Sequence, residues 1–305
     1  MPMGTADLRI GTSGWNYPAG RGTWNGIFYP PSRGRTKGFD ELSFYAEHFN
    51  TVEVNSTFYG QPRADVTRKW AERTPADFEF SAKLYQKFTH PKMVEHEPAN
   101  PFDLDDFKRG IDPLASAGKL GALLAQFPSS FKSNPASLDY LQWLLHAFDG
   151  YRVAVELRHR SWSDALGDTL SLLNTYGAAL VQIDEPKFRF SIAQNQLPNI
   201  RGIYYMRLHG RNAAQWWNHE KAEDRYNYLY SPREVTEFVE TIDAAREIVK
   251  KVYLYSNNHF SAKSVANAAM IKQQLGEPLE GEYPEDFLSR YPELVDAAKP
   301  VMKRP

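Results

Sequence analysis

The amino-acid sequence predicts a single parallel α/β barrel of eight strands surrounded by helices. Short apolar or alternating segments, typical of strands, take turns with longer helical segments along nearly the whole chain. The connections from a helix to the next strand are short, whereas several connections from a strand to the next helix are long. A length of 305 residues suits one barrel domain. An open, doubly wound sheet is the alternative, because the strand pattern alone does not show closure.

Each element is expected where its residue pattern is clearest. The strands are expected, in chain order, over residues 8–15, 51–58, 78–84, 120–127, 151–159, 179–185, 203–209 and 252–259. The helices are expected over residues 39–49, 63–73, 102–117, 135–148, 163–176, 232–249 and 261–275. Asn134-Pro135 and Ser231-Pro232 mark two helix starts, because Asn and Ser cap a first turn and Pro fits its first position.

The sixth unit and the end of the chain depart from this regular pattern. Residues 187–201 show no convincing helix between the sixth and seventh strands. We expect the barrel domain to comprise residues 1–276, and residues 277–305 to form a C-terminal extension that packs on the barrel, across one end. The long strand-to-helix connections of a barrel all lie at its carboxyl face, where such folds place their sites.

Composition excludes several classes of protein. The chain has 36 basic and 37 acidic residues, so it lacks the overall positive charge typical of nucleic-acid binding. It has no cysteine, which removes disulfides, thiolate nucleophiles and cysteine-based metal sites. The apolar segment 120–127 is too short to span a bilayer, and the first ten residues lack the apolar core of a signal peptide. We therefore expect a cytoplasmic protein with no membrane partner.

Polar side chains are expected inside the barrel, near the strand ends. Because successive strand residues face opposite sides, the apolar set should meet the helices and the other set should point inward. The inward set includes Glu53, Asn55, Lys83, Glu156, Arg158, Asp184, Arg207, His209, Asn257 and His259, with Gln126 at the end of the fourth strand. Burying an unpaired charge costs several kcal/mol, so Glu53 or Glu156 should pair with Arg158, Lys83 or Arg207. The alternative to a ligand site is a salt-bridge network that only packs the barrel.

Several sequence blocks resemble a known family. They are residues 11–15 (GTSGW), 52–59 (VEVNSTFY), 126–128 (QFP), 155–158 (VELR), 205–211 (YMRLHGR) and 257–259 (NNH), together with Tyr17, Trp70, Lys83 and Tyr226. Over essentially the whole chain they resemble the YecE-like family, domain of unknown function 72. The resemblance implies a TIM barrel and no particular activity. The basic segment 32–37 and the tail past Gly276 depart from the family pattern.

Most familiar chemistries lack their sequence signal. Glu53, Glu156, Asp184 and His209 come from four strands and could converge on a divalent metal, as in a phosphoesterase, but no metal-ligand spacing supports this and ion pairing is favoured. The fourth and seventh strands end in Gln126 and in Arg207 with His209, where barrel glycosidases carry two carboxylic acids. No dinucleotide or Walker A pattern is present, so the cofactor remains unidentified.

An anion site is the best-supported hypothesis. Arg207, His209 and Arg211 end the seventh strand and Asn257 and His259 end the eighth, where barrels commonly bind phosphate. We therefore expect an enzyme that acts on an anionic, phosphate-bearing or nucleotide-like substrate. Its candidate catalytic residues are Glu53, Glu156, Asp184 and His209. Its candidate binding residues are Trp15, Asn55, Tyr59, Lys83, Gln126, Arg158, Arg207, Arg211, Asn257 and His259.

A non-catalytic module that binds nucleic acid or another anionic ligand is the second hypothesis. Such a module would use a basic and aromatic rim, made of Arg33, Arg35, Lys37, Trp216 and Trp217. The tryptophan pair could instead anchor its loop on the barrel. The steep salt dependence of phosphate binding would separate the two hypotheses.

Overall fold

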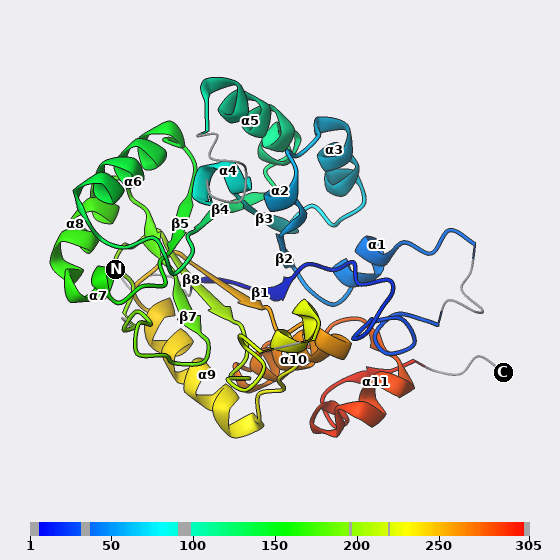
Figure 1. The fold of residues 1–305 in the computed structure, drawn as a ribbon. Coiled ribbons are helices and arrows are strands. Elements are labelled where there is room, and N and C mark those ends of the chain that lie inside the picture. The colour runs from blue at the N-terminus through cyan, green and yellow to red at the C-terminus, as the bar shows by residue number, and fades with distance from the viewer. Residues whose placement is uncertain (1–5, 32–36, 91–98, 195–196, 219, 302–305) are drawn as a thin grey trace.

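The centre of the molecule is one sheet of parallel strands wound into a barrel (Figure 1). The computed structural model describes residues 6–31, 37–90, 99–194, 197–218 and 220–301. Its strands are β1 (Asp7–Ser13), β2 (Thr51–Val54), β3 (Glu79–Lys83), β4 (Leu120–Gln126), β5 (Val153–Glu156), β6 (Ala179–Leu180), β7 (Gln182–Asp184), β8 (Ile203–Leu208) and β9 (Lys251–Ser256). They are hydrogen-bonded in the order β6-β5-β4-β3-β2-β1-β9-β8-β7. Because Val181 alone separates β6 from β7, these two segments form one interrupted strand and close the ring. The predicted TIM barrel is confirmed.

Helices cover the outside of this sheet (Figure 1). They are α1 (Glu41–Ala46), α2 (Ser56–Tyr59), α3 (Ala64–Glu72), α4 (Gln86–Thr89), α5 (Pro101–Ser116), α6 (Pro135–Ala147), α7 (Ser161–Asp164), α8 (Leu166–Thr175), α9 (Pro232–Arg246) and α10 (Lys263–Gln274). Both predicted helix starts are confirmed, since the Asn134 and Ser231 side chains accept backbone N–H groups in the first turns of α6 and α9. In the described residues between β7 and β8 there is no helix, so the sixth unit is irregular as expected.

The fifth and the last strand end three residues earlier than predicted, at Glu156 and Ser256, and two further strand predictions need a larger correction. The second strand ends at Val54 instead of continuing to Phe58, and residues 56–59 form the short helix α2. The hydroxyl of Thr57 donates to the carbonyls of Val54 (3.1 Å) and Lys83 (2.6 Å), which stabilises this turn against the ends of β2 and β3. Residues 56–59 were predicted as strand because β-branched and aromatic residues are common in strands, but the hydrogen bonds of Thr57 favour a helical turn here. The sixth strand is the second correction, because it is broken at Val181.

The barrel interior is polar and aromatic, while the apolar core lies between sheet and helices. Tyr205, Tyr253 and Tyr255 fill the middle of the barrel with ring centroids 5.3–6.2 Å apart. Their hydroxyls find partners inside: Tyr253 donates to Glu79 (2.5 Å), and the Tyr255 hydroxyl lies 2.9 Å from that of Ser81. These rings close the barrel from below, so space for a ligand lies toward the carboxyl ends of the strands.

The C-terminal extension packs beside the outer helices. It contains β10 (Glu282–Tyr283), α11 (Glu285–Arg290), the 3-10 helix η4 (Pro292–Leu294) and β11 (Lys299–Pro300). Tyr283 and Phe287 are fully buried, and their rings contact Phe28, which lies in the β1–α1 connection. Tyr283 also packs edge-on against His48, next to α1. None of the helices in the described part of the chain is long and apolar enough to cross a membrane.

Candidate functional site

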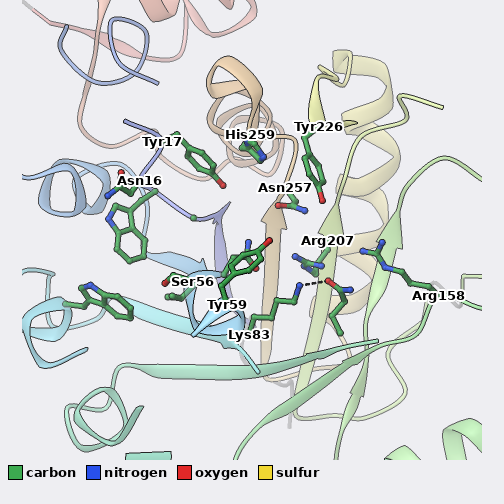
Figure 2. A pocket seen from close by; sticks show the side chains of 16 residues that line it. Asn16, Tyr17, Ser56, Tyr59, Lys83, Arg158, Arg207, Tyr226, Asn257 and His259 are labelled. Atoms are coloured by element: carbon green, nitrogen blue, oxygen red, sulfur yellow. Dashed lines mark hydrogen bonds between the residues drawn. The ribbon is translucent and has the colours of Figure 1, made fainter. Parts of the chain in front are cut away.

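A pocket of about 540 Å³ opens where the barrel strands end (Figure 2). This volume lies in the range of small-molecule sites. Its walls come from residues at or just past the ends of β1, β2, β3, β4, β5, β8 and β9. Nine of the predicted binding residues line it: Trp15, Asn55, Tyr59, Lys83, Gln126, Arg158, Arg207, Asn257 and His259. The strand ends thus bring together most of the residues that the inward-facing pattern selected.

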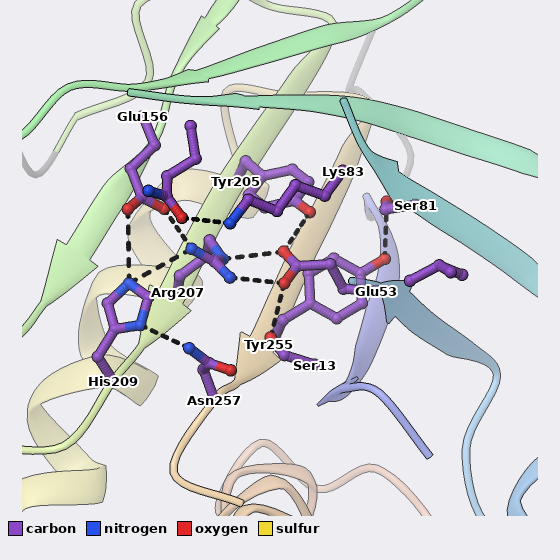
Figure 3. Close-up of polar contacts among 12 residues, drawn as sticks. Ser13, Glu53, Ser81, Lys83, Glu156, Tyr205, Arg207, His209, Tyr255 and Asn257 are labelled. Carbon is purple, nitrogen blue, oxygen red and sulfur yellow. Dashed lines mark hydrogen bonds and ion pairs between the residues drawn. The ribbon is translucent and has the colours of Figure 1, made fainter. Parts of the chain in front are cut away.

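An ion-pair network centred on Arg207 forms the floor of this pocket (Figure 3). Its Nε and Nη2 atoms donate to the two carboxylate oxygens of Glu53 at 2.9 and 2.7 Å, and its Nη1 donates to Glu156 at 2.5 Å. Glu53 also accepts hydrogen bonds from Ser13 and Tyr205, each at 2.7 Å. Of the expected pairings of Glu53 or Glu156 with Arg158, Lys83 or Arg207, those of both carboxylates with Arg207 form here. The forked anion contact expected of Arg207 is not available, because Glu53 already occupies the fork.

Arg158 extends the network toward the open pocket. Its Nε donates to Glu156 at 2.7 Å, and its Nη1 lies 3.4 Å from Glu185. Burial alone would raise the pKa of the Glu156 carboxyl, but the Arg207 and Arg158 guanidiniums hold that pKa well below its ordinary value. The Arg158 side chain is 18% exposed, against 2% for Arg207. Arg158 is therefore the guanidinium that a ligand can reach.

His209 lies in the network beneath the pocket lining. Its Nδ1 is 2.9 Å from the Asn257 amide nitrogen, and its Nε2 is 3.7 Å from Glu156. Burial, followed by the charge of Arg207, lowers the pKa of His209 to about 4, so the imidazole is neutral at pH 7. Glu53, Glu156 and His209, three of the four predicted catalytic residues, thus contact Arg207 and hold it in place; none of them lines the pocket.

Lys83 differs from both arginines in its surroundings. Its Nζ donates to the amide oxygen of Gln126 at 2.7 Å and lies 4.0 Å from the centre of the Phe58 ring. Among the described residues, no carboxylate lies within 4.0 Å of this nitrogen. Burial, followed by the charge of Arg207, lowers the pKa of Lys83 to about 7. Lys83 is thus a pocket amine whose charge no neighbouring acid of the described chain balances directly.

Aromatic rings form two walls of the pocket. On one side the Tyr17 ring stacks on His259, with centroids 4.5 Å apart and planes at 12°, and Tyr226 packs 5.0 Å from the same imidazole. A second aromatic group is the pair of Trp15 and Trp70, which meet edge-on at 5.4 Å. Flat rings of this kind suit a planar or sugar-like group.

Two polar details add to these walls. Burial lowers the pKa of His259 to about 4, so this ring is neutral at pH 7. The side-chain oxygen of Asn55 is buried, and no described atom hydrogen-bonds to it. It is therefore an acceptor that a ligand could satisfy.

The predicted places of Asp184 and Arg211 are wrong. Register pairs Ile183 with Arg207, and Asp184 with Leu208, so Ile183 points inward and Asp184 faces the helices. The alternation continues across Val181, because Ala179 pairs with the inward Ala154 and Ile183 with the inward Arg207; the predicted phase of this strand was therefore the opposite of the observed one. Asp184 accepts hydrogen bonds from Arg211 (2.9 Å) and from the Tyr230 hydroxyl (2.8 Å).

The chain turn at Gly210 explains the position of Arg211. Gly210 has a φ of +88°, in the left-handed region that favours glycine, and the chain turns there instead of continuing the strand. Arg211 then pairs with Asp184 and, on α9, with Glu234 and Glu237, each at 3.1 Å. Neither Asp184 nor Arg211 lines the pocket, whereas Arg207, Asn257 and His259 of the same predicted group do.

Other lining residues were not among the predicted site residues. Tyr17 and Tyr226 belong to long connections, Trp70 belongs to α3, and Ser56 begins α2. Tyr17, Trp70 and Tyr226 carry the family resemblance, which was the one signal that could have selected them. The spacing of residues could not have selected them, because strand alternation predicts neither the course of a loop nor which helix residue points into the pocket.

Only some residues of the predicted basic and aromatic rim are exposed in the described structure. Trp216 is buried and packs near Arg225, which donates to its backbone carbonyl, so it anchors its loop. Trp217 is 59% exposed and contacts Phe188 and Phe190. Lys37 is exposed, whereas Arg33 and Arg35 lie outside the described residues. Within the described ranges, no group of three or more His, Asp or Glu side chains is placed to hold a metal ion, so the phosphoesterase alternative gains no support.

The fold and site define a parallel α/β barrel protein with an aromatic, cation-lined pocket at the carboxyl ends of its strands. The sequence model of the family described as "Protein of unknown function DUF72" matches residues 9–287. The chain therefore belongs to the DUF72 family.

Relatives and solved structures agree with this membership. The UPF0759 protein YunF of Bacillus subtilis is 29% identical over 292 residues, which cover 90% of this chain and 96% of YunF. The UPF0759 protein YecE of Escherichia coli K12 is 34% identical over 124 residues, 40% of this chain and 43% of YecE. A DUF72 family protein from Thermotoga maritima has a TM-score of 0.77 and 32% identity, covering 89% of this chain and all of that one. These names state no substrate and no reaction.

Proposed function

We propose that this protein is an enzyme that acts on a small anionic molecule, phosphate-bearing or nucleotide-like, bound in the pocket at the carboxyl end of the barrel. The negative group of this substrate lies against Lys83 and the reachable side of Arg158. Its planar part lies between the aromatic walls.

The observation that carries this proposal is the incomplete charge balance of Lys83. Arg207 has carboxylate partners for Nε, Nη1 and Nη2, whereas the Lys83 nitrogen has a neutral amide partner at 2.7 Å. A buried cation without a counterion is costly, and an anionic ligand supplies that counterion. Lys83 and Arg158 line the same pocket, so one ligand can contact both.

Proton uptake on binding provides a sharp test. With a pKa of about 7, a large part of the Lys83 population is neutral at pH 8, and an anion that contacts it favours the ammonium form. Calorimetric titration with inorganic phosphate, and separately with adenosine monophosphate, should therefore show binding accompanied by proton uptake at pH 8. The uptake is measured by repeating the titration in buffers of different ionisation enthalpy.

A matched pair of lysine variants tests whether Lys83 is the residue that binds the anion and takes up the proton. Lys83→Gln should abolish both binding and proton uptake. Lys69→Gln removes the same charge from the exposed side of α3 and should leave both unchanged. Absence of binding to either ligand by the wild-type protein would refute the proposal and leave the network as a purely structural device.

Nucleic-acid binding stays as the second candidate because of an aromatic cluster in which Phe190 and Trp217 are exposed and Phe188 is half-buried. The Arg225 guanidinium lies 5.9 Å from the Trp217 ring, and aromatic rings beside cations suit single-stranded nucleic acid. Binding of an oligonucleotide that weakens steeply between 50 and 200 mM salt, and that Trp217→Ala reduces, would favour this candidate.

A further inference from the structure

We propose that Lys83 is a nucleophilic amine that forms a covalent imine with an aldehyde or ketone carried by the anionic substrate. This inference rests on the proposed function, because the negative group of the substrate is what holds its carbonyl against the amine. It narrows the substrate class to small anions that also contain a reactive carbonyl.

The position of Lys83 suits this chemistry. It is the last residue of β3, and the Thr57 hydroxyl, which bonds to the Lys83 carbonyl at 2.6 Å, fixes its backbone. The side chain lines the pocket, where its nitrogen is directed to Gln126 (Figure 2). An amide oxygen accepts a hydrogen bond from an ammonium or from a neutral amine. A carboxylate partner would keep the nitrogen protonated, but this partner leaves the lone pair of the neutral form free.

The charges that face Lys83 favour the neutral form. Arg207 and Arg158 oppose a third positive charge, and Glu156 and Glu53 act in the opposite direction but are already paired with the two guanidiniums. His90, beside Phe58, adds no positive charge at pH 7, because burial and then Lys83 lower its pKa to about 4. Burial of the amine strengthens the same preference. Desolvation and neighbouring cations are the two established ways to activate a lysine nucleophile.

The proposed step balances without a further reactant. The amine lone pair attacks the carbonyl carbon, and the carbonyl π electrons move to its oxygen. That oxygen takes up a proton as the nitrogen loses one, which gives a carbinolamine. The nitrogen lone pair then forms the C=N bond as the hydroxyl, with one more proton, leaves as water, and the iminium nitrogen gives a proton back. In sum, one amine and one carbonyl give one imine and one water, with no oxidation or reduction.

Reductive trapping with glyoxylate tests this inference. Glyoxylate carries an aldehyde and a carboxylate, and cyanoborohydride converts its imine into a stable carboxymethyl-lysine that peptide mass spectrometry locates. We expect wild-type protein at pH 7 to be labelled at Lys83 well before the exposed Lys69 of the same molecules. The initial labelling rate of Lys83 should rise with pH and level off above about 7, whereas that of Lys69 should still be rising at pH 9. Comparing two lysines within one protein makes the result independent of whether a variant folds.

Controls separate this inference from the proposed function. Lys83→Arg should abolish the early label, Lys69→Arg should not, and inorganic phosphate should slow the labelling of Lys83. Uncharged acetaldehyde should label Lys83 more slowly than glyoxylate. If phosphate binds but Lys83 is labelled no faster than Lys69, the imine inference is overturned and the anion site stands. If Lys83 is labelled first but phosphate neither binds nor competes, the nucleophile stands and the proposed anionic substrate is overturned.

Discussion

Partners, more than residue type, decide what each buried charge in this pocket can do. Arg207 and Lys83 are both inward cations at the end of barrel strands. Arg207 has two carboxylates on three of its nitrogens and is buried, so it serves as a rigid base for the pocket. Lys83 has an amide partner and faces the cavity, so its amine can still bind or react with a ligand. Alternation along a strand predicts that both point inward, but it does not predict how the few available carboxylates are shared.

Replacing Glu156 by Gln tests the structural side of this arrangement. Glu156 is fully buried and bonds to both Arg207 and Arg158. An amide there leaves two guanidiniums short of negative charge, which should lower the free energy of unfolding by about 3–5 kcal/mol at pH 7. Glu223→Gln, at an exposed position of the 3-10 helix η2 (Ala222–Tyr226), should change it by less than about 0.5 kcal/mol. Urea unfolding monitored by tryptophan fluorescence gives both values.

The difference in the free energy of unfolding between wild type and Glu156→Gln should change with pH in a defined direction. The pKa of Glu156 is lowered in the folded protein, so its carboxylate stabilises the fold above the ordinary value of 4.5. This contribution is lost as the pH falls through the folded-state pKa. The difference between wild type and Glu156→Gln should therefore narrow as the pH falls below 4.5. A difference that grew below pH 4.5 would contradict the assigned ion pairs.

At the scale of elements, the strands and helices with a regular residue pattern could be predicted, whereas the irregular sixth strand could not. The eight barrel strands and the principal helices follow from alternation and capping, because each must turn an apolar face to the core. The break at Val181 leaves the alternation unchanged, but the predicted phase of this strand was off by one residue, and such an error reverses every side chain, Asp184 included. Such a break has no residue signature here, since 179–185 reads as an uninterrupted strand.

Close contact between α3 and α5 gives a prediction at the same scale. Gly110 lies inside α5, and an added Cβ atom would lie 2.1 Å from the carbonyl oxygen of Pro62, just before α3. Gly110→Ala should thus destabilise the protein by about 1–3 kcal/mol through overpacking, although alanine is the better helix former. Gly167→Ala, in α8 with no atom within 4 Å of the added Cβ, should be neutral or stabilise by up to about 1 kcal/mol. Equal effects in chemical denaturation would contradict the close helix contact.

For the whole molecule, the prediction succeeded where the barrel imposes geometry and failed where loops and helices complete the site. Parallel strands end on one face, so residues as distant as Asn55 and His259 reach one pocket. Tyr17 and Tyr226 reach it through connections whose course depends on contacts formed only in the folded chain. One of these contacts is the hydrogen bond that the indole N–H of Trp24 donates to the His259 carbonyl at 2.7 Å. The pocket wall therefore depends on the β1–α1 connection, which in turn packs against the C-terminal extension through Phe28.

This dependence predicts that the extension unfolds together with the barrel. Phe287 is fully buried and contacts Phe28, Tyr283 and Tyr291 at centroid distances of 5.0–5.7 Å. Phe287→Ala should cost about 3–5 kcal/mol and move the whole calorimetric transition to lower temperature as one peak. Phe102→Ala, at a site 81% exposed, should leave the transition in place. A separate early transition in Phe287→Ala, with the main peak unmoved, would mean that residues 277–305 are an independent appendage. One shifted peak would instead mean that the extension is part of the structure that holds Trp24 and His259, and through them the aromatic wall of the pocket.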